Sequence, residues 1–121
     1  MAYRPYTLPT LTAAGTPSGS AVGTVQSYQP IEGRVVGVYF NYSGTATTTN
    51  VALTQVSTGG TILSVANSVA DGWYYPAIQV HDGTAGVRTW YDAPPTFGYL
   101  QVALSQGSAG DTLNTTVIVE F

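Results

Sequence analysis

The sequence contains neither cysteine nor lysine. Without cysteine the chain can form neither a disulfide bond nor a thiolate zinc site. Its cations are three arginines, and the net charge is −3 at pH 7, which argues against nucleic acid or an anionic membrane as a partner. Because no apolar run approaches the roughly 18 residues of a membrane span, we expect no transmembrane helix.

Charge of either sign is scarce. Charged residues make up 7% of the 121 residues, whereas a typical soluble domain has about 25%. The polarity comes instead from threonine, serine, glycine and tyrosine. Such a surface suits repeated, mostly uncharged contact with a larger partner. The length fits one domain with a substantial core.

The first 19 residues are expected to form an extended N-terminal arm, separate from a domain over 20–121. Pro5, Pro9 and Pro17 exclude a continuous helix or a central strand there. The arm also carries spaced apolar side chains that could lie in a groove of a partner, and the alternative is an arm that folds back on its own domain. These side chains are Tyr3, Tyr6, Leu8 and Leu11.

From residue 20 onward the pattern indicates β-structure. Valine, threonine, isoleucine and tyrosine dominate, and glycine, proline, asparagine and aspartate interrupt them at short intervals. This predicts an antiparallel β-sandwich of about seven to eight strands, with jelly-roll and immunoglobulin-like topologies left open. The predicted strands are 20–28, 32–42, 50–57, 61–66, 73–81, 97–106 and 112–121, with a further short strand possible at 87–91.

The strand over 32–42 is apolar on both faces, so we expect it to be central. Strict alternation would place Val36, Val38, Phe40 and Tyr42 on one face. The same rule would place Val35 and Tyr39 on the other.

Catalytic chemistry is hard to find. His81 and Asp82 could form half of an acid–base pair, but no nucleophile elbow accompanies them. The aspartates at 71, 82, 92 and 111 lie beside glycine or in turn-like segments, where aspartate makes local hydrogen bonds. No calcium loop and no phosphate-binding loop occurs. We therefore expect no enzyme activity, no cofactor and no metal.

The aromatic residues are the remaining candidates for a functional surface. In Trp73-Tyr74-Tyr75-Pro76, Trp73 and Tyr75 would face one side of a strand and Tyr74 the other. Such aromatics could fill the core, anchor an interface or form a sugar-stacking platform. Trp90 and Tyr91 lie in the long segment 82–96, which we expect to cover the sandwich or to contact a partner.

Several stretches between residues 30 and 121 resemble small virion proteins of tailed bacteriophages. They are 33–40 (GRVVGVYF), 61–68 (TILSVANS), 71–76 (DGWYYP) and 99–107 (YLQVALSQG), followed by a closing β run. The stretch 71–76 is the most specific of them. The family pattern would have an arginine after Tyr-Tyr-Pro, but Ala77 stands there, which puts any contact of that arginine in doubt.

The resemblance implies a non-enzymatic virion component, foremost a capsid decoration or cement protein. Such a protein would be made in the host cytoplasm and would bind the major capsid protein at the capsid surface, as a homo-oligomer with a trimer favoured over a dimer. Partner contacts are expected from the arm and from Trp90 and Tyr91. The alternatives are a head–tail, tail or fibre component, or a carbohydrate-binding module that uses Trp73, Tyr75, Trp90 and Tyr91.

Overall fold

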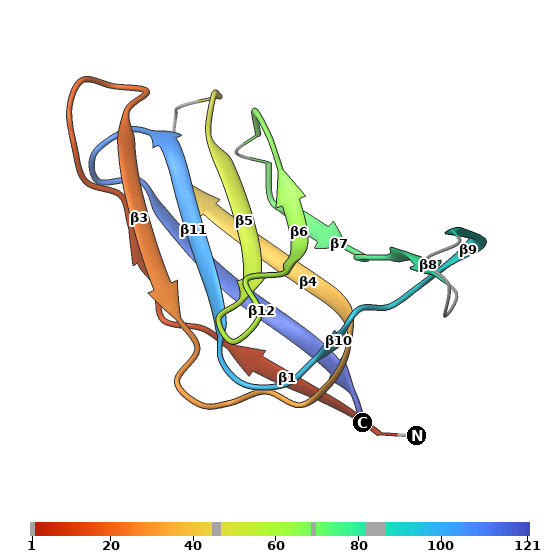
Figure 1. The fold of residues 1–121 in the computed structure, drawn as a ribbon. Helices are drawn as coiled ribbons and strands as arrows, with labels where there is room; N and C mark the ends of the chain where they lie inside the picture. The colour runs from red at the N-terminus through yellow and green to blue at the C-terminus, as the bar shows by residue number, and fades with distance from the viewer. Residues whose placement is uncertain (1, 45–46, 69, 82–86) are drawn as a thin grey trace.

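The computed structural model describes residues 2–44, 47–68, 70–81 and 87–121 (Figure 1). Every regular element in these ranges is a β-strand, and the larger strands form two antiparallel sheets packed face to face. The predicted all-β sandwich is thereby confirmed. No helix in the described ranges has the length and apolar character needed to cross a membrane.

The first sheet has six strands in the order β1-β12-β4-β10, with β2 also paired to β12 and β7 to β4. The second sheet has the order β3-β11-β5-β6, and β8 pairs with β9 in a separate two-stranded ribbon. The strands of the first sheet are β1 (Tyr3–Thr7), β2 (Leu11–Thr12), β4 (Gly33–Ser43), β7 (Gly72–Tyr74), β10 (Pro95–Thr96) and β12 (Thr112–Glu120). Those of the second sheet and the ribbon are β3 (Ala21–Gln26), β5 (Asn50–Gln55), β6 (Thr61–Val65), β11 (Leu100–Gly107), β8 (Ile78–His81) and β9 (Val87–Asp92).

The core lies between the two sheets and is built from alternate residues of their strands. On β12 and β11, alternate side chains point inward, as a half-buried strand requires, and these are leucine or valine apart from Thr115. The largest fully buried side chains are Phe40, Leu8, Leu11, Ile31, Leu53, Leu100, Leu113, Val35, Val38, Val51, Val102 and Val117. Each buried aliphatic side chain contributes about 1.5–3 kcal/mol relative to exposure.

The N-terminal residues do not stand apart as the expected arm. β1 runs along the edge of the first sheet, from Tyr3 opposite Glu120 to Thr7 opposite Thr116. Leu8 and Leu11 are 2% and 1% exposed and belong to the core. The structure therefore matches the alternative, an N-terminal segment that folds back on its own domain, because its apolar side chains find a core position there.

A β-bulge in β4 changes which side chains face the core. Gly37 pairs with Ile118, but Val35 pairs with Val119, so Val36 is an extra residue in the strand. Val35 is consequently fully buried, and Val36 is half-buried on the outer side. The expected placement of Val35 and Val36 was wrong for this reason, while Val38 and Phe40 share one face as predicted, and this face is the buried one.

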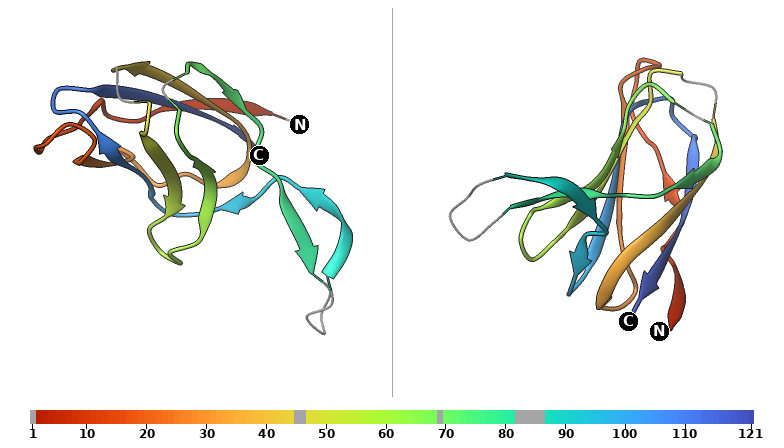
Figure 2. Two further views of the ribbon diagram at one scale, coloured as in Figure 1. Left: turned by 90° about the horizontal axis from the view of Figure 1, so that it is seen from above. Right: turned by 90° about the vertical axis from the view of Figure 1, so that its right-hand side faces the viewer.

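The strand predicted over 73–81 is divided in two. β7 ends at Tyr74 and β8 begins at Ile78, with the buried Pro76 between them. Proline lacks the N–H that a ladder needs, so it terminates the pairing. β8 then turns away from the sandwich with β9, the predicted strand near 87–91, as a projecting ribbon (Figure 2).

Candidate functional site

The outer surface of the six-stranded sheet carries a pair of aromatic rings in contact. Tyr39 of β4 lies opposite Trp73 of β7 in the register, so both side chains leave the sheet on the outer side. Their ring centroids are 5.1 Å apart with planes tilted by 51°. A Cβ atom built on Gly37 would lie 3.6 Å and 3.7 Å from Cζ3 and Cε3 of Trp73. The indole therefore lies over the one residue of this strand segment that has no side chain.

A shallow hollow of about 240 Å³ opens beside this indole. Its walls include exposed aromatic rings, since Tyr3 is 60%, Trp73 49% and Tyr75 74% exposed. None of the lining side chains carries a charge. We call this surface the aromatic face; it is made by Tyr3, Val36, Gly37, Trp73, Tyr75 and Ile118.

The polar neighbours of the aromatic face come from β12 and β1. Glu120 lies opposite Tyr3, and Thr116 lies opposite both Thr7 and Tyr39 in the two ladders. Because residues alternate across a strand, these side chains leave the sheet on the same side as Ile118. The face thus combines exposed rings with hydroxyl groups and the Glu120 carboxylate at its border, and its rings can stack against a flat, uncharged ligand.

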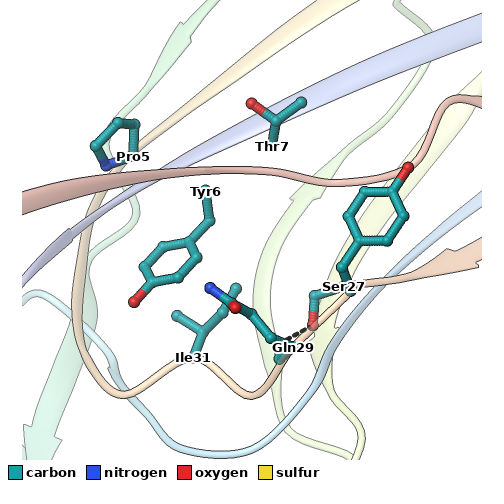
Figure 3. A pocket seen from close by; sticks show the side chains of 7 residues that line it. Pro5, Tyr6, Thr7, Ser27, Gln29 and Ile31 are labelled. Atoms are coloured by element: carbon teal, nitrogen blue, oxygen red, sulfur yellow. Dashed lines mark hydrogen bonds between the residues drawn. The ribbon is translucent and has the colours of Figure 1, made fainter.

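A second depression, the side groove, runs along the free edge of β1, between β1 and the segment 27–32. One part of it encloses about 270 Å³ and another about 450 Å³, and the two parts share Tyr6 and Gln29. Tyr6 and Tyr28 both line the first part, and Figure 3 shows the ring of Tyr6 beside the Gln29 side chain. The remaining lining residues are Arg4, Pro5, Thr7, Ser27, Pro30, Ile31, Glu32 and Phe121.

Ser27 holds the far wall of the side groove in place. Its hydroxyl donates to the carbonyl oxygen of Gln29 at 2.8 Å and accepts from the N–H of Leu100 at 3.1 Å. Ile31 is fully buried beneath the same segment, and its N–H donates to the carbonyl of Gly98 at 2.9 Å. The wall is therefore anchored to both the core and β11 before any ligand binds.

An aromatic cluster lies on the inner side of the same sheet. Phe40 contacts Tyr74 and Tyr42, with ring centroids 5.5 Å and 5.9 Å apart. Burial, followed by the neighbouring Tyr74 and Asp71, raises the pKa of Tyr42 well above its ordinary value. The hydroxyl of Tyr42 is buried without a hydrogen-bond partner among the described residues. This cluster supports the fold and is not open to a ligand.

The predicted partner-binding residues separate into three groups. Tyr3 lies exposed on the aromatic face, and Tyr6 lines the side groove. Leu8 and Leu11 are buried and cannot contact a partner without unfolding this edge. The two aromatic residues of the long segment, Trp90 and Tyr91, belong to β9, and their side chains fall outside the described part of the structure.

Among the aspartates that the structure describes, Asp111 and Asp92 accept from nearby N–H groups as the sequence pattern indicates, but Asp71 and Asp92 also contact residues distant in the sequence. Asp71 accepts from the N–H of Tyr42 at 2.6 Å, and Asp111 accepts from that of Ser108 at 3.0 Å. Asp92 forms an ion pair with Arg34. Asp82, the partner suggested for His81, lies outside the described residues. In the described ranges, no three histidine, aspartate or glutamate residues gather in a group suited to a metal ion.

Sequence reasoning missed the floor of the aromatic face and the wall of the side groove. The floor depends on Gly37 and Ile118, and the wall on Gln29. A glycine inside a strand does signal a close approach or a gap, so Gly37 could have been found. Gln29 carries no such signal, since its position depends on a loop held by distant residues.

No protein-family model and no curated protein matches the chain. Solved structures show weak similarity. One is a family two carbohydrate esterase from Cellvibrio japonicus, with 7% identity over 98% of this chain and 34% of that chain, and a TM-score of 0.44. A CBM29-2 variant, from family 29 of carbohydrate-binding modules, has 9% identity over 99% of this chain and 92% of that chain, with a TM-score of 0.45.

A third is the enzymatically active domain of tailspike protein 4 from bacteriophage CBA120. It has 10% identity over 97% of this chain and 19% of that chain, with a TM-score of 0.40. The chain thus spans about a third of the esterase and less of the tailspike domain. Likenesses of this strength do not bear on function, which has to be argued from the surfaces themselves.

Proposed function

We propose that this protein is a non-catalytic β-sandwich module that binds a neutral polysaccharide chain on its aromatic face. The observation that carries the proposal is the uncharged hollow walled by the exposed rings of Tyr3, Trp73 and Tyr75. These rings come from β1, β7 and the residue after β7, so the sheet itself holds two of them in place.

The chemistry of neutral sugars fits such a face. Pyranose rings present C–H groups on one side, and these groups are attracted to the negative face of an aromatic ring. The indole of Trp73 rests on Tyr39 and over Gly37, so stacking would cost little side-chain entropy. The lack of charge in the lining matches a ligand that is itself uncharged.

Affinity electrophoresis tests the proposal. The protein is run through native gels that contain soluble β-glucan, xylan or mannan, each at several concentrations. We expect at least one of these neutral polysaccharides to retard the protein and Trp73→Ala to remove the retardation. Tyr28→Ala is the matched control, because Tyr28 is 77% exposed and lies in the side groove. Equal mobility of wild type and Trp73→Ala in every gel would contradict the proposal.

A second candidate is a virion component, foremost a capsid decoration protein that binds the major capsid protein. One observation favours it: residues 71–76, the most specific part of the phage-like pattern, also supply Trp73 and Tyr75 of the aromatic face. Exposed tryptophan and tyrosine are typical anchors of protein interfaces. The same uncharged face would then bury itself against a capsid subunit.

The second candidate predicts a self-associating protein on a particle. Mass measurement of the purified chain, alone and mixed with empty capsids, would give a trimer and a capsid-bound fraction that Trp73→Ala reduces. Microscopy of purified particles would distinguish the capsid surface from a head–tail, tail or fibre location. A monomer that binds polysaccharide and leaves capsids unlabelled would reject this candidate in favour of the first.

A further inference from the structure

The side groove is a separate surface from the aromatic face. It lies along β1, which pairs only with β12 among the described strands and so forms an edge of the first sheet. Its opposite wall is the segment 27–32, which leaves β3 at the edge of the second sheet. Two edge strands therefore border the same side of the sandwich, and neither sheet covers the space between them.

The edge of β1 is unsuited to adding another strand. Ala2 and Phe121 exchange both backbone hydrogen bonds, and the N–H of Leu8 donates to Thr115. By the alternation of an antiparallel ladder, Pro5 and Thr7 then direct their backbone groups away from β12. Pro5 has no N–H to offer, and proline at an edge blocks strand pairing. A ligand in this groove must bind without a regular β-ladder.

The lining is rich in aromatic rings and prolines. Tyr28 is 77% exposed, Phe121 is 58% exposed, and Tyr6 packs partly against the core. Pro5 and Pro30 stand on the two walls. Grooves with this kind of lining accept polyproline II segments, because such segments are extended, preformed and lose little entropy on binding.

Several polar groups of the groove can donate hydrogen bonds. The Gln29 amide, the Tyr28 hydroxyl and the Arg4 guanidinium can all donate. Arg4 lies 4.8 Å from the centroid of the Phe121 ring and donates to the Tyr6 hydroxyl at 3.5 Å, so its side chain is already oriented. A proline-rich segment offers unpaired carbonyl oxygens and few N–H groups. The donors of the groove thus match the acceptors of such a ligand.

The larger part of the groove is lined by one side chain of each charge, Glu32 and Arg4. Among the described residues, Arg34 forms an ion pair with Asp92, and Glu32 forms none. Glu32 is exposed and lines the larger part of the groove, beside Pro30 and Gln29. Arg4 contacts the Tyr6 hydroxyl and the Phe121 ring, so the carboxylate of Glu32 is left to a basic residue of the ligand.

We propose that the side groove binds an extended proline-rich peptide that carries a basic residue, with the prolines between Tyr6 and Tyr28 and the basic residue at Glu32. The site is independent of the aromatic face, so this proposal stands whether or not the protein binds polysaccharide.

The test is an NMR titration of the full chain. The probe is a synthetic peptide of roughly ten residues with two Pro-x-x-Pro repeats and one arginine. We expect amide shifts at Thr7, Tyr28, Gln29, Ile31 and Glu32, and no shifts at Trp73. Tyr28→Ala should raise the dissociation constant by roughly tenfold, which corresponds to about 1.4 kcal/mol. Tyr28→Phe keeps the aromatic ring and should lose less affinity for the peptide.

Two controls separate the contributions. Glu32→Gln should weaken the arginine-containing peptide and leave a glutamine-containing version of the peptide unchanged. Trp73→Ala should not affect peptide binding at all. The proposal is overturned if the peptide causes no shifts at millimolar concentration, if Tyr28→Ala binds like wild type, or if a neutral oligosaccharide shifts these residues and the peptide does not.

Discussion

Tyr39 and Trp73 lie opposite each other where β4 pairs with β7, with their ring centroids 5.1 Å apart. This contact holds an exposed indole on the outside of a sheet, where a side chain of that size would otherwise move freely. The pairing of Val38 with Tyr74 in the same ladder points the next aromatic residue into the core. A three-residue strand therefore supplies one ring to the core and another to the aromatic face.

The Tyr42 hydroxyl is buried without a hydrogen-bond partner among the described residues, so we expect its removal to improve stability, most of all at high pH. The raised pKa keeps folded Tyr42 neutral, whereas in the unfolded chain it ionises near pH 10. Below that pH both states hold the proton. Above it the unfolded state binds fewer protons, so the free energy of unfolding falls as pH rises.

We expect Tyr42→Phe to be neutral or stabilising at pH 8, because it removes a buried polar atom that has no partner. At pH 11 its advantage over wild type should grow. Urea unfolding at the two pH values measures both effects, and Tyr28→Phe is the exposed control. A Tyr42→Phe advantage that is the same at both pH values would contradict the assignment.

Gly33 begins β4 with a positive φ of 133°. A Cβ atom there would lie 2.5 Å from the carbonyl oxygen of Glu120 and 2.5 Å from Cγ1 of Val119. We expect Gly33→Ala to lower the free energy of unfolding by at least about 3 kcal/mol, since conformational strain and a clash with backbone combine.

Gly59 is the matched control for this prediction. It has a φ of 72°, and a Cβ built on it meets no atom within 4 Å. Gly59→Ala should therefore cost only the strain of the backbone conformation, about 1 kcal/mol. Similar losses for the two alanine variants in denaturant unfolding would show that the clash at Gly33 is relieved by movement of β12.

The same hydroxyl group of Ser27 holds the wall of the side groove and contributes to the stability of the fold. Ser27 is 6% exposed, and its hydroxyl forms hydrogen bonds with both Gln29 and Leu100. Ser27→Ala leaves the Leu100 N–H without its partner, so we expect a loss of about 1–3 kcal/mol in thermal or urea unfolding. Ser57→Ala, which removes an exposed hydroxyl bonded to Phe97 at 3.4 Å, should change stability by less than about 0.5 kcal/mol. Equal effects would contradict the role of Ser27.

Much of the fold could be predicted because most strands alternate. β12 and β11 show their buried faces directly in the sequence, and β5 and β6 meet at a glycine-rich turn. The bulge at Val36 could not be predicted, since Val35 and Val36 are equally apolar and the extra residue is defined only by the partner strand. The pairing of Leu11 with Leu113 could not be predicted either, because it joins opposite ends of the chain.

The aromatic face was predictable in part. The alternation of Trp73, Tyr74 and Tyr75 indicates which rings share a side, and the structure leaves Trp73 and Tyr75 exposed. Tyr3 joins them only because β1 lies on the far side of β12, opposite Glu120. Such a juxtaposition follows from strand order, which the sequence pattern does not specify.

The most direct test of the central claim is isothermal titration calorimetry with the soluble oligosaccharide of whichever neutral polysaccharide retards the protein. Wild type should bind, Trp73→Ala should lose at least about tenfold in affinity, and Tyr28→Ala should match wild type. Circular dichroism should show that both variants remain folded, since Trp73 and Tyr28 are exposed. If folded Trp73→Ala binds the oligosaccharide as tightly as wild type, the aromatic face is not the glycan site.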